Sequence, residues 1–315
     1  MTAISKTRRP YSPPRPLGGR YGGIVPRRRR ARQALLFLLP ALLTLGAFVW
    51  YPMLSALRLS FTDSSGFGVE NWIGFENYTR ILSDPDILNT VVNTFLYMAL
   101  FTPAAVGFAL LIALVLVART TPLRGLFRTA LFLPFVVSLA VAAFAWSYLL
   151  DPLVGLLSYW LSLVGIHLGD VLNSPTLAMP TVVLVAVWKN FGFYMVIFIA
   201  GLNDIPRDLY EAARVDGAGS FARFRHITVP MLSNTLAFVL IFAMIAALQA
   251  FDQIYVMTGG GPYGHTQTVV MEIYTAGFRR LELGFASALS YLLLVATLIL
   301  SLIQFIFFAR KEGDR

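Results

Sequence analysis

Residues 210–230, YEAARVDGAGSFARFRHITVP, form a polar, glycine-containing passage between two long apolar runs. The chain around it has 315 residues, of which 57% are hydrophobic and only 13% are charged. Soluble domains carry about 25% charged residues, so the composition indicates that lipid is the main solvent of this protein. A polar passage in such a chain is either a connector at the membrane surface or a surface that meets another protein.

The passage is predicted to fold as two short helices joined by an elbow. Pro206 suits the first turn of a helix, where its missing N–H is not needed. Asp216 and Gly217 predict the end of that helix, because glycine tolerates the left-handed conformation that closes helices. Ser220 is a candidate cap for the second helix. The local chemistry therefore predicts a preformed projection, and an interfacial pair of helices that only connects two spans is the alternative.

Outside this passage, the chain contains six apolar segments that are long enough to cross a bilayer, which takes about 20 residues. These spans are predicted near 35–57, 89–118, 129–150, 176–202, 231–251 and 283–308. The predicted fold class is therefore an all-α integral membrane protein with six transmembrane helices.

The organisation along the chain follows from these spans. Residues 1–32 are rich in proline, glycine and arginine and are predicted to be a disordered basic cytosolic arm, because they cannot bury enough apolar surface to fold alone. Residues 33–310 are the predicted permeation domain, with 203–230 as its one sizeable loop on the inner side. Residues 311–315 are a predicted cytosolic tail.

Lysine and arginine predict the orientation of the spans. If both termini are cytosolic, the inner segments hold 20 of the 25 basic residues, the outer loops hold four, and Lys189 lies within a span. Cytoplasmic loops of membrane proteins carry such an excess of basic residues. The net charge of +9 is therefore explained by the orientation of the protein in the membrane, and no nucleic-acid partner is predicted.

Several kinds of chemistry have no candidate residues in this sequence. Cysteine is absent, and the three histidines are too far apart for metal-ligand spacing, so no catalytic or metal site is predicted. A phosphate-binding loop needs a lysine after a glycine, and Lys6, Lys189 and Lys311 do not follow one. The six spans contain no carboxylate and no histidine, which argues against a proton-coupled carrier. An ion-coupled secondary transporter that binds Na⁺ through backbone carbonyls remains the alternative from another class.

The stretch EAARVDGAGSFARFRHITVP, residues 211–230, resembles the EAA loop of permease subunits from binding-protein-dependent ABC importers. Other passages resemble the carbohydrate-type branch of that family, which includes the maltose and glycerol-3-phosphate permeases. These passages are LLPALLTLGAFVWYPMLSALRLSF, GFENYTRILSDPDILNTVVNTF, NDIPRDLYEAA and YVMTGGGPYGHT. The resemblance covers roughly residues 33–310.

This resemblance implies the fold of the type I importer transmembrane domain, placed in a bacterial inner membrane. It implies a second permease subunit, expected to be a different chain, two cytosolic ATPase subunits that hold ATP and Mg²⁺, and an extracytoplasmic solute-binding protein. The chain itself is then a transport subunit without a cofactor and not an enzyme. The TGGGP stretch, residues 258–262, is predicted to be a turn outside the fifth span, and the resemblance implies that this loop also helps to shape the outer mouth and to meet the binding protein.

The resemblance also implies that the elbow docks on the ATPase, with Glu211 as the charged anchor and Gly217 as the bend. The residues expected to couple the two subunits are Glu211, Ala212, Ala213, Asp216 and Gly217.

Lys189 lies near the middle of the fourth predicted span, where a charge costs about 2.5–3.5 kcal/mol, so it is expected to face a polar cavity or a partner. Aromatic rings and amides beside it suit a sugar, and the resemblance places the family's cavity on the fourth and fifth spans. The predicted pathway residues are Trp188, Lys189, Asn190, Phe193, Gln249 and Asp252. A di- or oligosaccharide is the predicted substrate, with glycerol-3-phosphate or its diesters as the alternative. A purely structural Lys189, bonded to a carbonyl of the partner subunit, also remains open.

Overall fold

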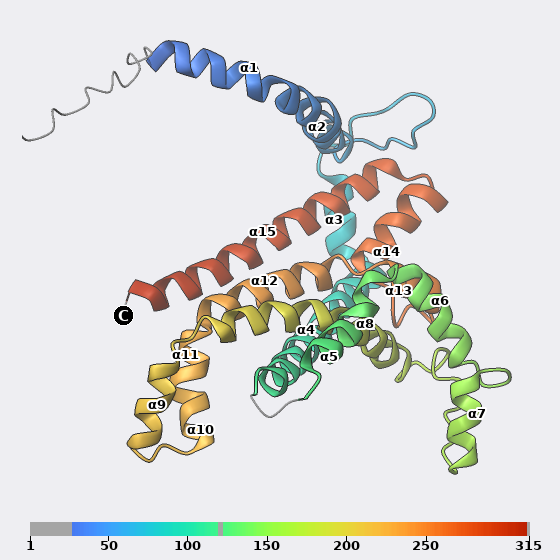
Figure 1. Cartoon of the computed structure of the whole chain (residues 1–315). Helices are drawn as coiled ribbons and strands as arrows, with labels where there is room; N and C mark the ends of the chain where they lie inside the picture. Colours follow the sequence, from blue (N-terminus) through green and yellow to red (C-terminus); the bar gives the residue numbers. More distant parts are fainter. Residues whose placement is uncertain (1–26, 119–121, 314–315) are drawn as a thin grey trace, which may run out of the picture. The chain divides into compact units, whose positions relative to one another are not determined.

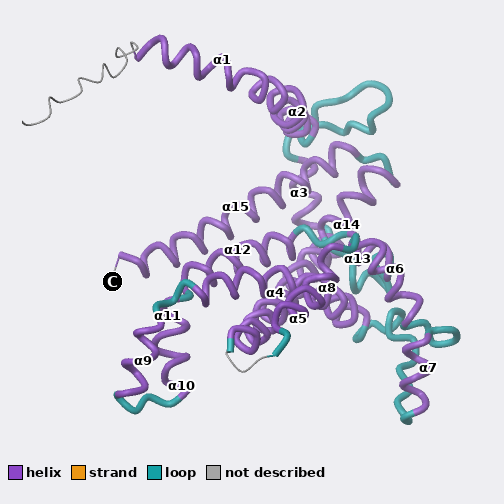
Figure 2. The backbone as a smooth tube through the Cα atoms, viewed as in Figure 1, coloured by secondary structure: helices purple, strands orange, loops and turns teal. Residues whose placement is uncertain are grey.

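The computed structural model describes residues 27–118 and 122–313, and these residues form helices joined by loops (Figure 1). The only β pairing among them is one isolated antiparallel bridge between Thr62 and Trp72, and Figure 2 shows no strand in this part of the chain. The predicted all-α fold class is therefore confirmed. The chain divides into two compact units, residues 1–54 and residues 55–315.

The first unit contains helix α1 (Arg27–Leu45), a π-helical turn (Gly46–Trp50) and the start of α2 (Tyr51–Leu59). Helical structure already begins at Arg27, so residues 27–32 are not part of an irregular arm, which agrees with the good helix propensity of arginine. The rest of the predicted arm, residues 1–26, lies outside the described residues. Leu36–Leu59 is long and apolar enough to span a membrane.

The core of the second unit is built on two long helices, α4 (Pro85–Val117) and α8 (Ala178–Asn203), which pack against each other. Helix α4 begins where the Asp84 side chain accepts a hydrogen bond from the N–H of Asp86, with Pro85 in the first turn. Fully buried Ala105, Ala109 and Ala113 form a small-residue row along α4. Small side chains allow membrane helices to approach closely, which is how α4 and α8 bury each other.

Further helices complete the second unit around this pair. Helices α5 (Arg124–Val136) and α12 (Ser233–Leu248) pack against the α4–α8 pair. The remaining helices are α3 (Glu76–Ser83), α6 (Leu139–Leu149), α7 (Leu156–Leu163), α9 (Arg207–Val215), α10 (Ser220–Arg223), α11 (Val229–Met231), α13 (Asp252–Met257), α14 (Val269–Tyr274) and α15 (Leu283–Gly313), with π-helical turns at Phe224–Thr228 and Thr275–Arg279.

Two of the predicted spans are bent. Helices α5 and α6 meet at 95°, because Val137 and Ser138 have extended backbone between them, so the span predicted at 129–150 is a bent pair of helices. The helical segment Ser220–Met231 meets α12 at 70°. Four helices in the described ranges pass as membrane spans alone, and there are six if each bent pair counts as one. Hydropathy does not report backbone direction, which is why the sequence shows six apolar segments but no bend.

The backbones of α5 and α8 approach each other closely at Gly192. A Cβ added there would collide with the carbonyl oxygen of Leu131 and meet the Cα of Phe132 at 3.0 Å. The backbone of α5 thus occupies the space that any side chain would need.

We predict that Gly192→Ala destabilises the purified protein by about 1–3 kcal/mol, the usual cost of overpacking. The measurement is the midpoint of thermal unfolding in detergent. The matched control is Gly107→Ala on α4, where an added Cβ has no neighbour within 4 Å. Equal midpoints for the two variants would contradict the close contact between α5 and α8.

Candidate functional site

The polar passage forms a projection at one end of α12, made of α9, the turn at 216–219 and α10 (Figure 1). Neither α9 nor α10 contains a buried residue. Two short helices joined by an elbow are what the sequence predicts, so that part of the prediction is confirmed.

The elbow is closed by a glycine in the left-handed conformation. Gly217 has φ +77°, its N–H donates to the carbonyl of Arg214 at 3.1 Å, and the N–H of Ala218 donates to the carbonyl of Ala213 at 2.8 Å. This pair of bonds is the Schellman arrangement, which satisfies the last carbonyls of α9. The predicted cap at Ser220 is wrong, because Gly219 occupies the N-cap position and Ser220 is the first helical residue. Its hydroxyl accepts from Arg223 instead.

The projection is attached to the membrane helices through its inner face. The hydroxyls of Tyr210 and Thr228 form a hydrogen bond at 2.9 Å, which joins α9 to the segment leading into α12. Thr228 is buried, and Tyr210 and Ile227 pack against the main core. Ile205, between α8 and α9, is buried as well. A force applied to α9 therefore reaches the ends of α8 and α12 through packed side chains.

The five predicted coupling residues lie on the outer part of this attached projection. Four of them are exposed and one is half-buried: Glu211, Ala212, Asp216 and Gly217, then Ala213. Glu211 forms no ion pair with another residue in the described part of the chain. The structure thus presents a free carboxylate and a small-residue surface on a rigid support.

Lys189 lies against one ring of a small aromatic cluster. Its Nζ lies 4.7 Å from the ring centroid of Phe135 on α5, and that ring stacks on Phe193 with centroids 4.7 Å apart. Trp188 makes an edge contact with Trp146 on α6. Phe135 and Trp146 are not among the predicted pathway residues. They lie on the two sides of the bend between α5 and α6, and the sequence analysis did not predict that bend.

The other pathway residues are only partly brought to Lys189. Asp252, at the start of α13, forms no ion pair with Lys189 in the part of the chain that the structure describes. The Asn190 amide donates to the carbonyl of Ala186 at 2.8 Å, so that donor is used inside α8. Gln249 is exposed at the C-terminal cap of α12. The structure therefore supports a charged and aromatic cluster around Lys189 more strongly than a ring of amides.

The TGGGP loop is held against α4 by polar side chains that the sequence did not single out for this role. Asn93 donates to the carbonyls of Gly264 and Gln267 at 2.8 and 3.1 Å, and Thr94 accepts from the N–H of Val269. The buried side chains of Gln253 and Tyr97 bond to each other at 2.7 Å. This loop is an integral part of the packed helices at that end of the molecule.

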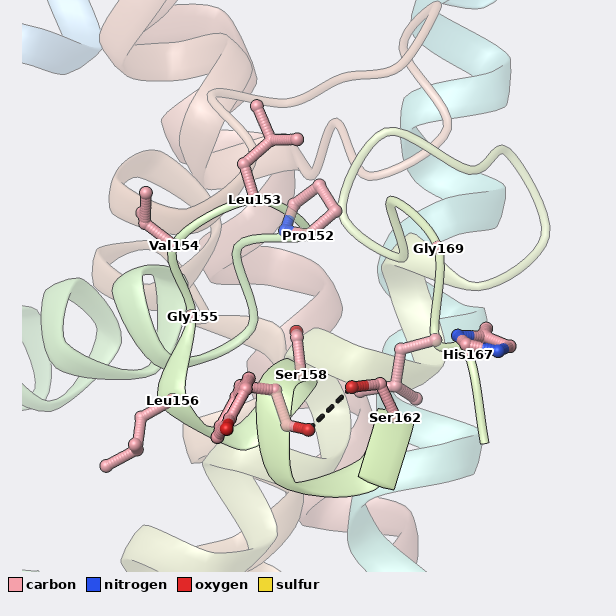
Figure 3. Close-up of a pocket in the computed structure, with 11 residues that line it drawn as sticks. Pro152, Leu153, Val154, Gly155, Leu156, Ser158, Ser162, His167 and Gly169 are labelled. Carbon is pink, nitrogen blue, oxygen red and sulfur yellow. Dashed lines mark hydrogen bonds between the residues drawn. The ribbon is translucent and has the colours of Figure 1, made fainter. Parts of the chain in front are cut away.

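A separate pocket of about 530 Å³ lies in the connection between α6 and α8 (Figure 3). The Asp151 carboxylate accepts hydrogen bonds from the N–H groups of Val154 and Leu153, which lower its pKa below the usual value and hold the turn above α7. His167 lies at the edge of the pocket, and no lining residue is acidic.

Across residues 27–118 and 122–313, no cluster of three His, Cys, Asp or Glu side chains could hold a metal ion.

Comparison with known proteins gives a consistent result. The chain is 35% identical over 278 residues to the sn-glycerol-3-phosphate transport system permease protein UgpA of Agrobacterium fabrum, covering 88% of this chain and 94% of the relative. It is 37% identical over 260 residues to the sulfoquinovosyl glycerol transport system permease protein SmoG of the same organism, covering 82% and 84%. A chain of a bacterial alginate ABC transporter, solved with an alginate-pentasaccharide-bound periplasmic protein, matches with a TM-score of 0.75 and 23% identity, covering 88% of this chain and 93% of that one.

A family model also matches almost the whole chain, from residue 16 to residue 313. Together with the attached elbow and the helical fold, this match shows that the chain belongs to the family of binding-protein-dependent transport system inner membrane components, the permease subunits of ABC importers.

Proposed function

We propose that this permease forms half of the translocation pathway for a sugar or sugar-like polyol. We also propose that its elbow binds a cytosolic ATPase and is moved when that ATPase changes conformation. The observation that carries the proposal is the construction of the elbow. Its motif residues are exposed, while Tyr210 and Ile205 tie it to the ends of the membrane helices. An exposed elbow that is packed onto membrane helices fits the role of a docking element for a separate subunit. The ATPase subunit of an ABC importer is the proposed partner.

The proposed assembly contains this chain, a second and different permease, two ATPase subunits with ATP and Mg²⁺, and a solute-binding protein on the outer side. The solved alginate transporter, which is bound to a periplasmic protein, supports the last of these partners. Family membership leaves no support for the ion-coupled carrier that the sequence alone kept open. The excess of basic residues on the elbow side supports cytosolic termini in a bacterial inner membrane.

The proposed cycle is alternating access. The pathway is open to the cytosol at rest, and closure of the ATPase dimer pulls the elbow and opens the pathway outward. Glu211 is the proposed anchor, Gly217 sets the bend, and Ala212 and Ala213 let the partner approach closely. The bonded contact between Tyr210 and Thr228 carries the movement into α12.

The proposed substrate carries an acidic group. Lys189 lies over the ring of Phe135 and forms no ion pair with another described residue, so its charge is left for a ligand anion. The names of the two relatives, which include a phosphate ester and a sulfo sugar, support this choice. Aromatic faces beside a cation suit a glycoside or polyol with a phosphate, carboxylate or sulfonate.

Sidedness can be tested directly because the chain has no cysteine of its own. We predict that Asp216→Cys reacts with a membrane-impermeant maleimide only in inside-out vesicles. Ser65→Cys, in the loop before α3, is the matched probe and should react only in right-side-out vesicles. The opposite pattern would contradict the proposed orientation.

For the anchor, we predict that Glu211→Lys leaves the chain inserted but abolishes substrate-stimulated ATP hydrolysis and uptake in the reconstituted complex. Reversing one charge of a docked pair typically costs about 2–5 kcal/mol. Asp208→Lys makes the same change of charge on the same helix outside the motif and is expected to retain coupled activity. Normal uptake by Glu211→Lys would remove the docking role.

For the pathway, we predict that Lys189→Gln raises the KM for an acidic substrate by about tenfold or more, since a hydrogen bond to a charged group is worth about 1.5–3 kcal/mol. Lys189→Arg, which keeps the charge, should lose much less. The measurement is uptake into vesicles with the substrate presented by its binding protein. Unchanged KM in Lys189→Gln would assign Lys189 a structural role.

A further inference from the structure

A pocket of about 750 Å³ lies where the ends of α4 and α8 meet the starts of α5 and α9. One part of its wall is apolar and comes from Leu114 and Val117 of α4 and Leu202 of α8. The lining also includes three arginines, Arg124, Arg207 and Arg214. A pocket lined by both apolar and cationic side chains is a surface for an amphipathic anion.

The charged side chains that line this pocket form no ion pairs within the described part of the chain. Glu211 is its one acidic lining residue, and no ion pair joins Glu211, Arg124, Arg207 or Arg214 to another side chain among residues 27–118 and 122–313. Arginine presents planar paired donors that match phosphate geometry. Three arginines and one glutamate in the described lining therefore leave a cationic excess for a ligand to neutralise.

Helix ends add smaller contributions of both signs. Arg124 and Arg207 are the first residues of α5 and α9, so the positive ends of these two helices reach the pocket. The C-terminal ends of α4 and α8 also reach it, and their carbonyls disfavour an anion. Because these contributions oppose each other, the arginine side chains decide the sign of the pocket.

The position of the pocket along the spans selects the kind of anion. Val117 is the last residue of one candidate span, and Leu202 lies next to the last residue of another, so the pocket lies where hydrocarbon gives way to headgroups. Exposed Leu111 continues the apolar surface along α4 toward the bilayer interior. Basic pockets between membrane helices on the cytoplasmic side bind anionic lipid headgroups.

We infer that this pocket binds the phosphate headgroup of an anionic phospholipid from the cytosolic leaflet, held by Arg124 and by the two arginines of α9. The inference rests on the proposed orientation of the elbow. A bound headgroup bridges α5 to α9, so it steadies the helix that also carries Glu211. Phosphatidylglycerol has the chemistry required: a single negative phosphate diester with acyl chains that can lie along α4.

The test uses the full chain in detergent micelles doped with phosphatidylglycerol or with zwitterionic phosphatidylcholine, with retained lipid counted by native mass spectrometry. Arg124→Gln is compared with Arg128→Gln, a matched control one turn further along α5 that is exposed and does not line the pocket. We expect phosphatidylglycerol to be retained over phosphatidylcholine, with retention about fivefold weaker in Arg124→Gln and unchanged in Arg128→Gln. Arg207→Gln should weaken it similarly.

Three results would overturn the inference. The first is equal retention of the two lipids, and the second is an equal effect of Arg124→Gln and Arg128→Gln, which would indicate only general surface charge. The third is displacement of the lipid by an equal concentration of inorganic phosphate, which would indicate a site for free anions. The lipid count is made without the ATPase, so a negative result for lipid binding does not affect the interpretation of the Glu211→Lys experiment. The coupling role and the orientation of the elbow are each tested in a separate experiment.

Discussion

The packing of α4 against α8 is the contact on which the other functional parts depend. Their interface is closed by small residues on α4 and by fully buried side chains such as Phe101 and Phe198. At one end, α4 holds the TGGGP loop through Asn93 and Thr94. At the other end, α8 leads through buried Ile205 into the elbow. One rigid helix pair thus connects the two surfaces at which partner proteins are proposed to act.

The bends in the fold complement this rigid pair. In a bilayer, backbone groups freed by a break must be buried in protein or face a water-filled cavity. The break between α5 and α6 lies beside Phe135, whose ring contacts the Lys189 ammonium and stacks on Phe193. The break before α12 turns the chain toward the elbow. The irregular backbone is therefore concentrated where transport and coupling are proposed.

The sequence predicts the parts of this structure that depend on local chemistry or on length. Runs of apolar residues are sufficient to place the spans, and Gly217 is sufficient to place the elbow, because both signals lie within a few neighbouring residues. Pro134, in the turn before the 95° bend, is a local signal for a disrupted helix, but neither the size nor the direction of the bend can be read from the sequence. Phe135 was missed for the same reason. The bond between Gln253 and Tyr97 joins residues 156 positions apart, so only the fold reveals it.

The ion pairs around α14 and the start of α15 constrain how this protein can change over evolutionary time. Glu272 is buried and bound to Arg280, while Glu282 lies between Arg80 and Arg280. Loss of one member of a buried pair leaves an uncompensated charge and is strongly destabilising. Glu272 and Arg280 are therefore expected to be exchanged together among homologues, and a chimera that borrows α14 must take Arg280 with it. The pair of Arg80 and Glu282 is more exposed and contributes less.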